Sequence, residues 1–299
     1  MSSEPVAWVF NLDAEDELKR GRGSHTPANA VRLRVQRLLP ALRSLLRPGD
    51  GILWPESSTE IVSMAGRAWC PTPWALAQMK RAGVRVPDAP APAVLRQVNH
   101  RRFAHSLGQS LPLAQMVDDH ESLLDVLRDR DRALPTISFE NNWLMKMPLG
   151  YAGRGRRKIK PGGQLNAADA VWVNAALESG EGLQVEPMVA RELDCAIHGL
   201  IDPAGALTLG QPTTFTADAS GTWLSSQLAA PGALTFSEMT ALEEAARVTA
   251  KALFGAGYFG PFGLDAFRWR APDGSNHFQP RCELNARYSM GWATGMPGI

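Results

Sequence analysis

One segment constrains the fold of this chain more than any other: residues 144–156, LMKMPLGYAGRGR, join an apolar strand to a loop with three glycines. The strand delivers Lys146, and Gly150, Gly153 and Gly155 follow it. Glycines let backbone N–H groups approach phosphate oxygens closely, and a lysine on a strand supplies a fixed positive charge. The segment therefore predicts a cradle for a polyphosphate, with a glycine-rich hairpin carrying solvated arginines as the alternative.

Competing nucleotide-binding motifs can be tested by their spacing. The chain has neither a GxxxxGK[ST] P-loop nor a GxGxxG turn that opens a helix after the first predicted strand, which disfavours P-loop and dinucleotide-binding folds. It has no HRD or DFG triplet, which disfavours a protein kinase, and no GxSxG or HExxH motif. Catalysis by a side-chain nucleophile is therefore not indicated.

Polar side chains gather near the C-terminal end, on the last two predicted strands. Asp265 lies in GPFGLDAF, and Glu283 and Asn285 lie in CELNAR. Residues two apart on a strand point to the same face, so Glu283 and Asn285 point together, and Arg287 would join them if the strand continued. Two carboxylates and an amide beside a phosphate site offer the oxygen ligands that Mg²⁺ prefers. The alternative is a solvated strand face with a salt bridge.

The rest of the chain alternates between short apolar runs and amphipathic stretches, which predicts an α/β (α+β) fold. A proline-rich connector at residues 87–92 marks a first boundary. Helix ends are set by caps and by Gly or Pro. The predicted strands cover residues 6–12, 51–54, 183–189, 193–201, 262–269 and 277–284, and the predicted helices cover 30–46, 74–81, 121–128, 166–177 and a stretch capped by Ser237.

The order of these features carries a family resemblance. With a strand lysine, glycine loop, hinge, carboxylate and E-x-N-x-R pattern in sequence, the chain resembles the ATP-grasp superfamily, especially its carboxylate–amine/thiol ligases. The match runs from about Asn99 to Gly291, and residues 6–92 resemble the subdomain that precedes it. The resemblance implies an ATP-grasp fold: an N-terminal α/β subdomain, then two α+β subdomains that clasp ATP. The implied bounds are 1–98, 99–182 with the glycine loop, and 183–299 with the metal site.

The resemblance also implies roles for individual residues. Lys146 would contact the ATP phosphates and act in catalysis with Arg287, which would steady the transferred phosphoryl group or the acyl phosphate. Magnesium, for which manganese could substitute, would be held by Asp265, Glu283 and Asn285. The glycine loop would be a flap that closes over the phosphates, with contacts from Gly150, Gly153, Arg154 and Gly155. The segment VEPMVARELDCAIHG would be the hinge that holds the nucleoside: Glu186 would bind the adenine amino group, the Met188 and Val189 backbone the ring edge, and Glu192 the ribose.

One position departs from the family pattern. Many members place a second lysine near the start of the nucleotide domain, whereas this chain reads NHRRFAH there. His100, Arg101 or Arg102 would have to replace that lysine. An arginine holds phosphate through a planar fork rather than as a point charge, so the replacement changes this contact.

The implied function is that of an ATP- and Mg-dependent ligase. ATP would phosphorylate a small-molecule or peptide carboxylate, and an amine would attack the acyl phosphate to give an amide, ADP and phosphate. Magnesium, a lysine and an arginine suit phosphoryl transfer, which depends on positioning and electrostatics. Two alternatives keep the fold: an ATP-binding sensor or scaffold without turnover, and a phosphotransferase (kinase) acting on another acceptor. A homodimer is left open.

Composition excludes several other classes. With 31 Lys and Arg against 30 Asp and Glu, no overall field favours nucleic acid or a membrane surface. The cysteines Cys70, Cys195 and Cys282 form no CxxC pair, which indicates reduced thiols. The N-terminal residues turn acidic where a signal peptide would be apolar, and the chain has no apolar run of about eighteen residues. A cytoplasmic protein is expected.

Tryptophan is abundant and is mostly expected in the core. Trp143, Trp172, Trp223 and Trp269 are candidates to line a substrate pocket. Met290 and Trp292, just after the metal motif, are candidates to border the acceptor site.

Overall fold

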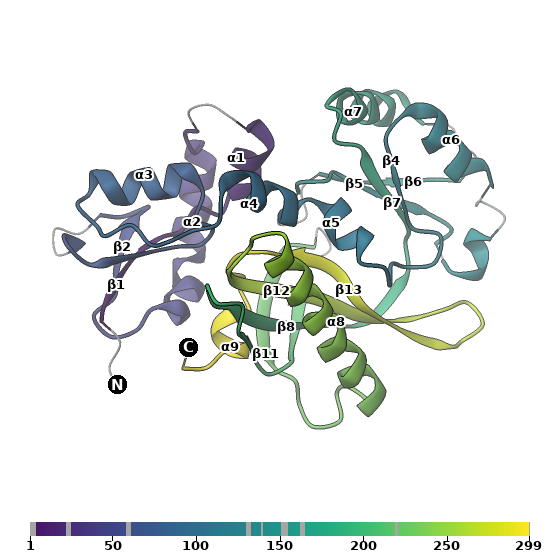
Figure 1. The fold of residues 1–299 in the computed structure, drawn as a ribbon. Coiled ribbons are helices and arrows are strands. Elements are labelled where there is room, and N and C mark those ends of the chain that lie inside the picture. Colours follow the sequence, from purple (N-terminus) through teal and green to yellow (C-terminus); the bar gives the residue numbers. More distant parts are fainter. Residues whose placement is uncertain are drawn as a thin grey trace.

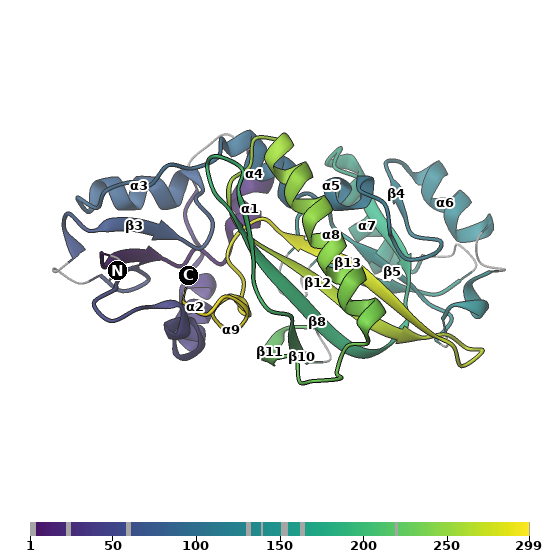
Figure 2. The same ribbon diagram turned by 60° about the horizontal axis from the view of Figure 1, so that its bottom comes forward.

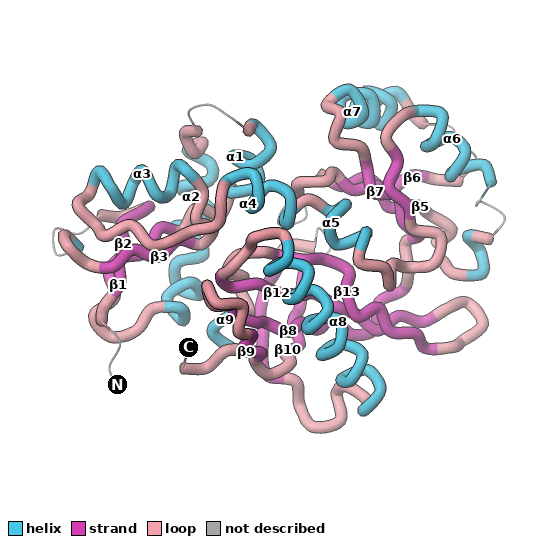
Figure 3. The backbone as a smooth tube through the Cα atoms, in the orientation of Figure 1, coloured by secondary structure: helices cyan, strands magenta, loops and turns pink. Residues whose placement is uncertain are grey.

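A computed structural model describes residues 4–21, 25–57, 61–129, 133–138, 140–150, 155–161, 165–218 and 221–298. In this part of the chain three β-sheets follow one another, each flanked by helices (Figures 1 and 3), so the expected α/β fold is confirmed. Within the same residues no helix is both long and apolar enough to cross a bilayer. Cys70, Cys195 and Cys282 are free thiols.

The first sheet is parallel, with strand order β2-β1-β3. Parallel neighbours need a crossover, and α2 (Asn29–Leu42), continued by η1 (Arg43–Leu45), connects β1 to β2. Alternate residues of β1 pack into two different cores, so both faces of the sheet are covered. The other elements of this unit are β1 (Val6–Val9), β2 (Gly51–Trp54), β3 (Ala65–Ala68), α3 (Pro73–Arg81) and α4 (Pro92–Asn99).

The segment after β1 differs from its prediction. The strand predicted over residues 6–12 ends at Val9, and α1 (Ala14–Arg20), which the sequence does not predict, begins within the acidic residues that follow. Glu15, Asp16 and Glu17 occupy its first turn and basic residues its last, so the charges complement the helix dipole at both ends. Both glutamates are buried, which places α1 against the body of the protein.

The middle sheet is antiparallel, with strand order β4-β7-β5-β6. Its strands are β4 (Gln115–Val117), β5 (Trp143–Lys146), β6 (Arg156–Ile159) and β7 (Leu183–Pro187), and its neighbouring helices are α5 (Arg101–Ser106), α6 (His120–Asp129), η3 (Leu134–Thr136) and α7 (Ala167–Glu178). The predicted subdomain bounds remain predictions. Because β7 pairs with β4 and β5, strand pairing favours a second division after Pro187 rather than before Leu183.

The third sheet has six antiparallel strands, in the order β11-β10-β8-β12-β13 with β9 paired to β8. Figure 2 shows α8 running across this sheet. The sequence predicts β8, β12 and β13 within a few residues of their ends, but it misses the three strands between β8 and α8. The elements are β8 (Ala190–Ile201), β9 (Leu207–Leu209), β10 (Thr213–Ala217), β11 (Trp223–Leu228), α8 (Phe236–Gly255), β12 (Gly260–Arg270), β13 (Asn276–Asn285) and α9 (Trp292–Gly295).

The N-cap of α8 is Thr235, not the predicted Ser237. The Thr235 hydroxyl accepts from the Glu238 backbone N–H at 3.2 Å, and the Glu238 carboxylate accepts from the Thr235 N–H at 2.8 Å. This reciprocal capping box satisfies two backbone donors at once, whereas a cap at Ser237 would lack the glutamate three residues on.

Two of the three units share one hydrophobic core. Trp8 and Phe10 of the first unit belong to the same cluster as Ile197, Leu264 and Leu242 of the third. The middle unit has a separate core, which includes Leu123, Trp143, Val173 and Val185. The first and third units therefore form one packed body, and the middle unit is stabilised by itself.

Candidate functional site

A cavity of about 220 Å³ lies on the face of the six-stranded sheet that does not carry α8. Side chains of β8 alternate between the two faces. Cys195 and Ile197 pack in the core with α8, whereas Asp194, Ala196 and His198 line the cavity. The sheet is thus the floor of the site, and the other two units supply its walls.

The cavity has two chemically different halves. The cationic half is lined by Arg101, Lys146, Arg156 and Arg191 together with Asp194, Asp265, Glu283 and Asn285. The distal half lies over β10 and β11 and is mainly apolar; its lining includes Leu38, Trp69, Phe215, Trp223, Ser289 and Met290. Arg287 also lines the cavity, two residues after Asn285 and two before Ser289 along the chain. It therefore connects the two halves.

The two predicted metal-binding carboxylates face each other across neighbouring strands. Asp265 of β12 is in register with Glu283 of β13, and Gly263 is in register with Asn285, so the three side chains share one face. Burial, and next the charge of Glu283, raise the pKa of Asp265 to about 7. Two carboxylates this close carry more negative charge than their surroundings balance.

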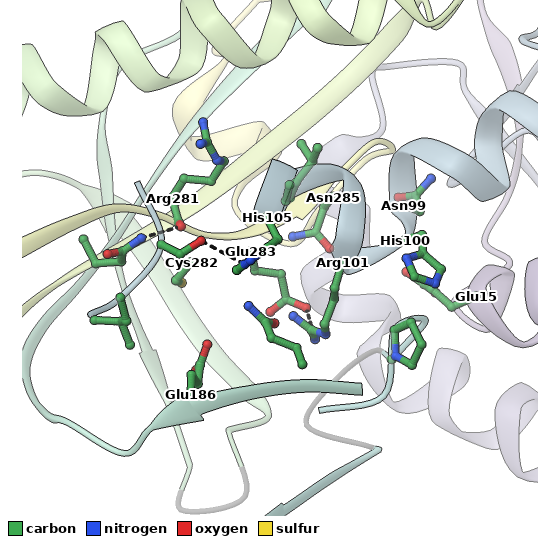
Figure 4. A pocket seen from close by; sticks show the side chains of 18 residues that line it. Glu15, Asn99, His100, Arg101, His105, Glu186, Arg281, Cys282, Glu283 and Asn285 are labelled. Carbon is green, nitrogen blue, oxygen red and sulfur yellow. Dashed lines mark hydrogen bonds and ion pairs between the residues drawn. The ribbon is translucent and has the colours of Figure 1, made fainter. Parts of the chain in front are cut away.

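Glu283 is held by a cation that the sequence offers only as one of three candidates. Arg101 Nη2 lies 2.8 Å from Glu283 Oε1, and Arg101 Nε donates to the Met147 carbonyl at 3.0 Å. Figure 4 shows the two charged side chains pointing toward each other. Burial opposes ionisation of Glu283, but Arg101, Lys146 and Arg287 together hold its pKa below the ordinary value. Glu283 is therefore ionised at neutral pH.

Of the three candidates for the second lysine, only Arg101 lines this cavity. Arg102 pairs with the exposed Asp118, and His100 lies 3.3 Å from Glu181. Arg101 has a planar guanidinium with several donors and lies beside Glu283, so it is suited to hold a phosphate oxygen next to the metal ligands.

These side chains fit a magnesium ion. In the described part of the chain no group of three or more His, Cys, Asp or Glu side chains is arranged to hold a metal. Asp265 and Glu283 are two carboxylates with one amide, Asn285, and a hard divalent cation would offset the repulsion between the two carboxylates. Such an ion would draw its remaining ligands from water or phosphate. The metal site stays a prediction, and the carboxylate and amide oxygens that would form it lie on one face of the sheet.

Lys146 and Glu186 form a buried ion pair, with side chains 7% and 6% exposed. They come from the neighbouring strands β5 and β7, where Lys146 pairs in register with Gln184 and Glu186 lies two residues further along. The family resemblance implies that Lys146 contacts the phosphates of ATP and that Glu186 contacts its adenine. The structure adds that the two side chains pair with each other. A buried pair of this kind fixes the position of Lys146 because moving it would leave a buried charge alone.

The hinge residues are placed unequally. The Met188 N–H donates to the Asn142 carbonyl at 2.9 Å, and its own carbonyl accepts from Ser138, so an adenine contact through the hinge backbone would have to come from Val189. Glu192 lies 4.0 Å from Arg270 and lines neither of the two cavities described here. Its predicted ribose contact has no support in the geometry, because the register between β8 and β12 shifts at Glu192 and Arg191 lines the cavity in its place.

The glycine loop is seen at its two ends. Gly150 lines a smaller cavity beside the first, shown in Figure 4, together with Glu186 and Arg101. Gly155 has φ +72, and a Cβ there would come within 3.0 Å of Met147, so a glycine is required at this position. The predicted contacts of Gly153 and Arg154 lie outside the described residues.

Arg287 is fixed by a carboxylate far away in sequence. Its Nε donates to Glu15 Oε1 at 2.6 Å and its Nη1 donates to the Tyr288 carbonyl at 2.9 Å, and Glu15 is among the causes that raise its pKa against the effect of burial. β13 ends at Asn285, so Arg287 reaches the cavity from a loop and not by continuing the strand. The guanidinium lies 5.5 Å from the centre of the Trp69 ring.

The distal half contains residues that the sequence reasoning did not select. Of the four candidate tryptophans, Trp223 lines the cavity, while Trp143 and Trp269 are core residues; Met290 lines it and Trp292 does not. Trp69, His198 and Ser226 were missed. The alternating pattern of residues 213–217 offered a signal for the β10 strand, but nothing local connects these positions with Trp69.

Comparison with solved structures identifies the fold. No family model matches the chain, and no curated protein matches it in sequence. A D-cycloserine synthetase is 15% identical, with 98% of this chain and 95% of that one covered at a TM-score of 0.53. The D-alanyl-alanine synthetase A of Vibrio cholerae is 11% identical, with 98% of this chain and 93% of that one covered at a TM-score of 0.51. The biotin carboxylase of Campylobacter jejuni, in its β-γ-ATP complex, is 12% identical, with 98% of this chain and 61% of that one covered at a TM-score of 0.57.

Likeness at this level of identity shows the fold. It extends over nearly the whole chain, and in two of these structures over nearly the whole of the other protein. Together with the order of the sheets and the cavity between them, it supports one assignment: the chain has the ATP-grasp fold.

Proposed function

We propose that this protein is an ATP- and Mg-dependent, ADP-forming ligase that joins a carboxylate to an amine through an acyl phosphate. The proposal is carried by one observation: Lys146, Arg101 and Arg287 share a cavity with Asp265, Glu283 and Asn285. Three cations and a set of magnesium donors in one place are what transfer of a phosphoryl group requires. The ATP-grasp fold and the ATP complex of one solved relative agree with it.

The reaction balances without a side-chain nucleophile. A substrate carboxylate oxygen attacks the γ-phosphorus of ATP, the bond to the β-phosphate oxygen breaks, and ADP leaves. The amine nitrogen then attacks the acyl carbon, the amide forms, and phosphate leaves with the original carboxylate oxygen while the nitrogen loses a proton. Bound magnesium would neutralise phosphate charge; Lys146 and Arg101 would hold phosphate oxygens, and Arg287, fixed by Glu15, would orient the carboxylate.

The test follows an oxygen atom. Purified protein is incubated with ATP, magnesium, a panel of ¹⁸O-labelled carboxylic acids and a panel of amines, and ADP and phosphate are analysed by mass spectrometry. We expect ADP release that depends on both substrates, with one ¹⁸O in the phosphate. ATP binding without ADP release from any pair would refute the ligase and favour the sensor or scaffold alternative. Phosphate that stays on the acceptor would favour the phosphotransferase alternative.

We expect the enzyme to act in the cytoplasm, where ATP is available. Its partners would then be a small-molecule or peptide carboxylate and an amine.

A further inference from the structure

The distal half of the cavity has the position of a binding site for the acid. Along the last segment of the chain, Glu283 and Asn285 line the cationic half, Arg287 follows, and Ser289 and Met290 line the distal half. A carboxylate held at Arg287 for activation would therefore have the rest of its molecule in the distal half. This placement of the acid rests on the proposed function, because the ligase reaction requires the carboxylate end of the acid to lie at Arg287.

The walls of the distal half are apolar and rich in aromatic rings. Trp69 comes from the first unit, and Phe215 and Trp223 come from the β10–β11 pair, where Phe215 is in register with Ser226. Leu12, Leu38 of α2, Ala217 and Met290 also contribute apolar lining. Aromatic rings in the lining favour an aromatic group beside them, because stacked and edge-to-face contacts add to the burial of apolar area. Trp69 also lies beside Arg287, where such a group would begin.

The charges of the lining select against an ammonium group. The carboxylates among the described lining residues are Asp194, Asp265 and Glu283. Asp265 and Glu283 belong to the cationic half, whereas Asp194, which the register of β8 and β10 brings beside Phe215, is neutralised by Arg191 at 3.1 Å. Glu15 does not line this cavity, and its Oε1 is engaged by Arg287. A substrate ammonium placed here would be desolvated without an anion, which is strongly unfavourable.

The uncharged polar groups of the distal half lead to the same conclusion. Ser226 Oγ accepts from the Trp223 indole N–H at 2.8 Å, so its hydroxyl proton remains available to an acceptor atom. His198 Nε2 lies 2.8 Å from Ser289 Oγ, and burial lowers the pKa of His198 to about 4, so this histidine is neutral at pH 7. Neither group offers the negative charge that an ammonium donor needs.

The floor of the distal half is also rigid. The His198 ring is packed by three glycines, since a Cβ at Gly263, Gly291 or Gly295 would come within 3.2, 2.8 or 2.7 Å of a ring atom. These distances leave no room for side chains at the glycines and little for movement of the ring. A preformed floor allows binding without reorganisation, which favours affinity for one shape.

We propose that the distal half is the acid subsite and that its substrates are carboxylic acids with a flat, apolar, aromatic body and no ammonium group. The matched pair that tests this is 3-phenylpropionate and phenylalanine, which differ only in the ammonium group. Binding is measured by isothermal titration calorimetry on the full chain without nucleotide. We expect 3-phenylpropionate to bind at least tenfold more tightly than phenylalanine.

Two variants locate the binding in the distal half. Trp223→Ala should weaken 3-phenylpropionate binding at least tenfold, whereas Leu224→Ala, a neighbour on β11 that is 57% exposed, should leave it within twofold. Ser226→Asp introduces the missing anion, so it should weaken 3-phenylpropionate binding and strengthen phenylalanine binding. Circular dichroism checks that each variant is folded.

The outcomes separate this proposal from the ligase itself. Equal or tighter binding of phenylalanine by the unmodified protein, or an unchanged dissociation constant in Trp223→Ala, would overturn the acid subsite. ADP release with short aliphatic acids or amino acids but not with aromatic acids would overturn it too, while leaving the ligase in place. The expected binding preference, accompanied by no ADP release with any amine, would support the subsite and refute the ligase.

Discussion

His198 should make the protein sensitive to mild acid. Its side chain is 1% exposed, its Nδ1 has no hydrogen-bond partner, and burial alone lowers its pKa to about 4 from the ordinary value of about 6.5. Because the folded state binds this proton less readily than the unfolded state, the contribution of His198 to stability is complete above about pH 6.5 and is lost as the pH falls toward 4. With these two pKa values the loss between pH 7.5 and pH 5 is about 2 kcal/mol, and it approaches about 3 kcal/mol well below pH 4.

Urea unfolding at pH 7.5 and pH 5 measures this loss, and the comparison with His198→Gln isolates it. Glutamine places an amide where Nε2 meets Ser289 but cannot take up a proton, so the variant should lose about 2 kcal/mol less than the unmodified protein over this pH range. His120→Gln serves as the control, since His120 is exposed at the start of α6 and its replacement should leave the pH dependence unchanged.

The quantity to compare is the change in the free energy of unfolding between pH 7.5 and pH 5, not the stability of the variant at either pH. If His198→Gln loses as much stability on acidification as the unmodified protein, the reasoning from burial is refuted. NMR titration of the His198 Cε1–H in the folded protein gives an independent reading, and a midpoint near 6.5 would refute it equally.

Three further predictions concern the site and the fold. Glu283→Gln should lower magnesium-dependent ADP release about a hundredfold or more while the circular dichroism spectrum stays unchanged, because one of two metal carboxylates is lost; unchanged turnover would remove Glu283 from the metal site. Arg101→Ala should raise the KM for ATP about tenfold or more, because it removes a charge-assisted hydrogen bond to a phosphate. Arg102→Ala breaks only an exposed pair with Asp118 and should change the KM less than twofold. Equal effects of the two substitutions would mean that Arg101 does not contact ATP. Thr235→Ala should lower the free energy of unfolding by about 1 kcal/mol through loss of the α8 capping box, and Ser237→Ala by much less; the reverse order in urea unfolding would show that Ser237 is the cap after all.

The parts of the fold that the sequence predicts well are those with a strong local pattern. β12 and β13 are joined by a short polar turn at residues 271–275, and the alternation along β13 correctly puts Glu283 and Asn285 on one face. The glycine loop joins β5 to β6 as expected. In each case the information lies within about ten neighbouring residues.

The missed strands carry a weaker signal for a physical reason. β11 is an edge strand with exposed residues on much of its length, so TWLSSQL alternates only faintly between polar and apolar positions. The partners of the charged site residues were missed because they depend on pairing between distant segments. Arg287 and Glu15 are 272 residues apart, and the Lys146–Glu186 pair follows only once β5 and β7 are known to be neighbours.

The two halves of the cavity differ in how firmly their walls are joined to the floor. The distal half lies between the first and third units, which share one core, so the packing that stabilises the protein also sets the shape of this half. Lys146 and Arg156 belong to the middle sheet, whose core is separate. A unit with its own core can shift as a body at little cost in buried apolar area, whereas a shared core cannot open without exposing its side chains to water. Movement that admits a nucleotide should therefore open the cationic half and leave the distal half intact, and this is the physical reason to expect that the acid binds before ATP arrives.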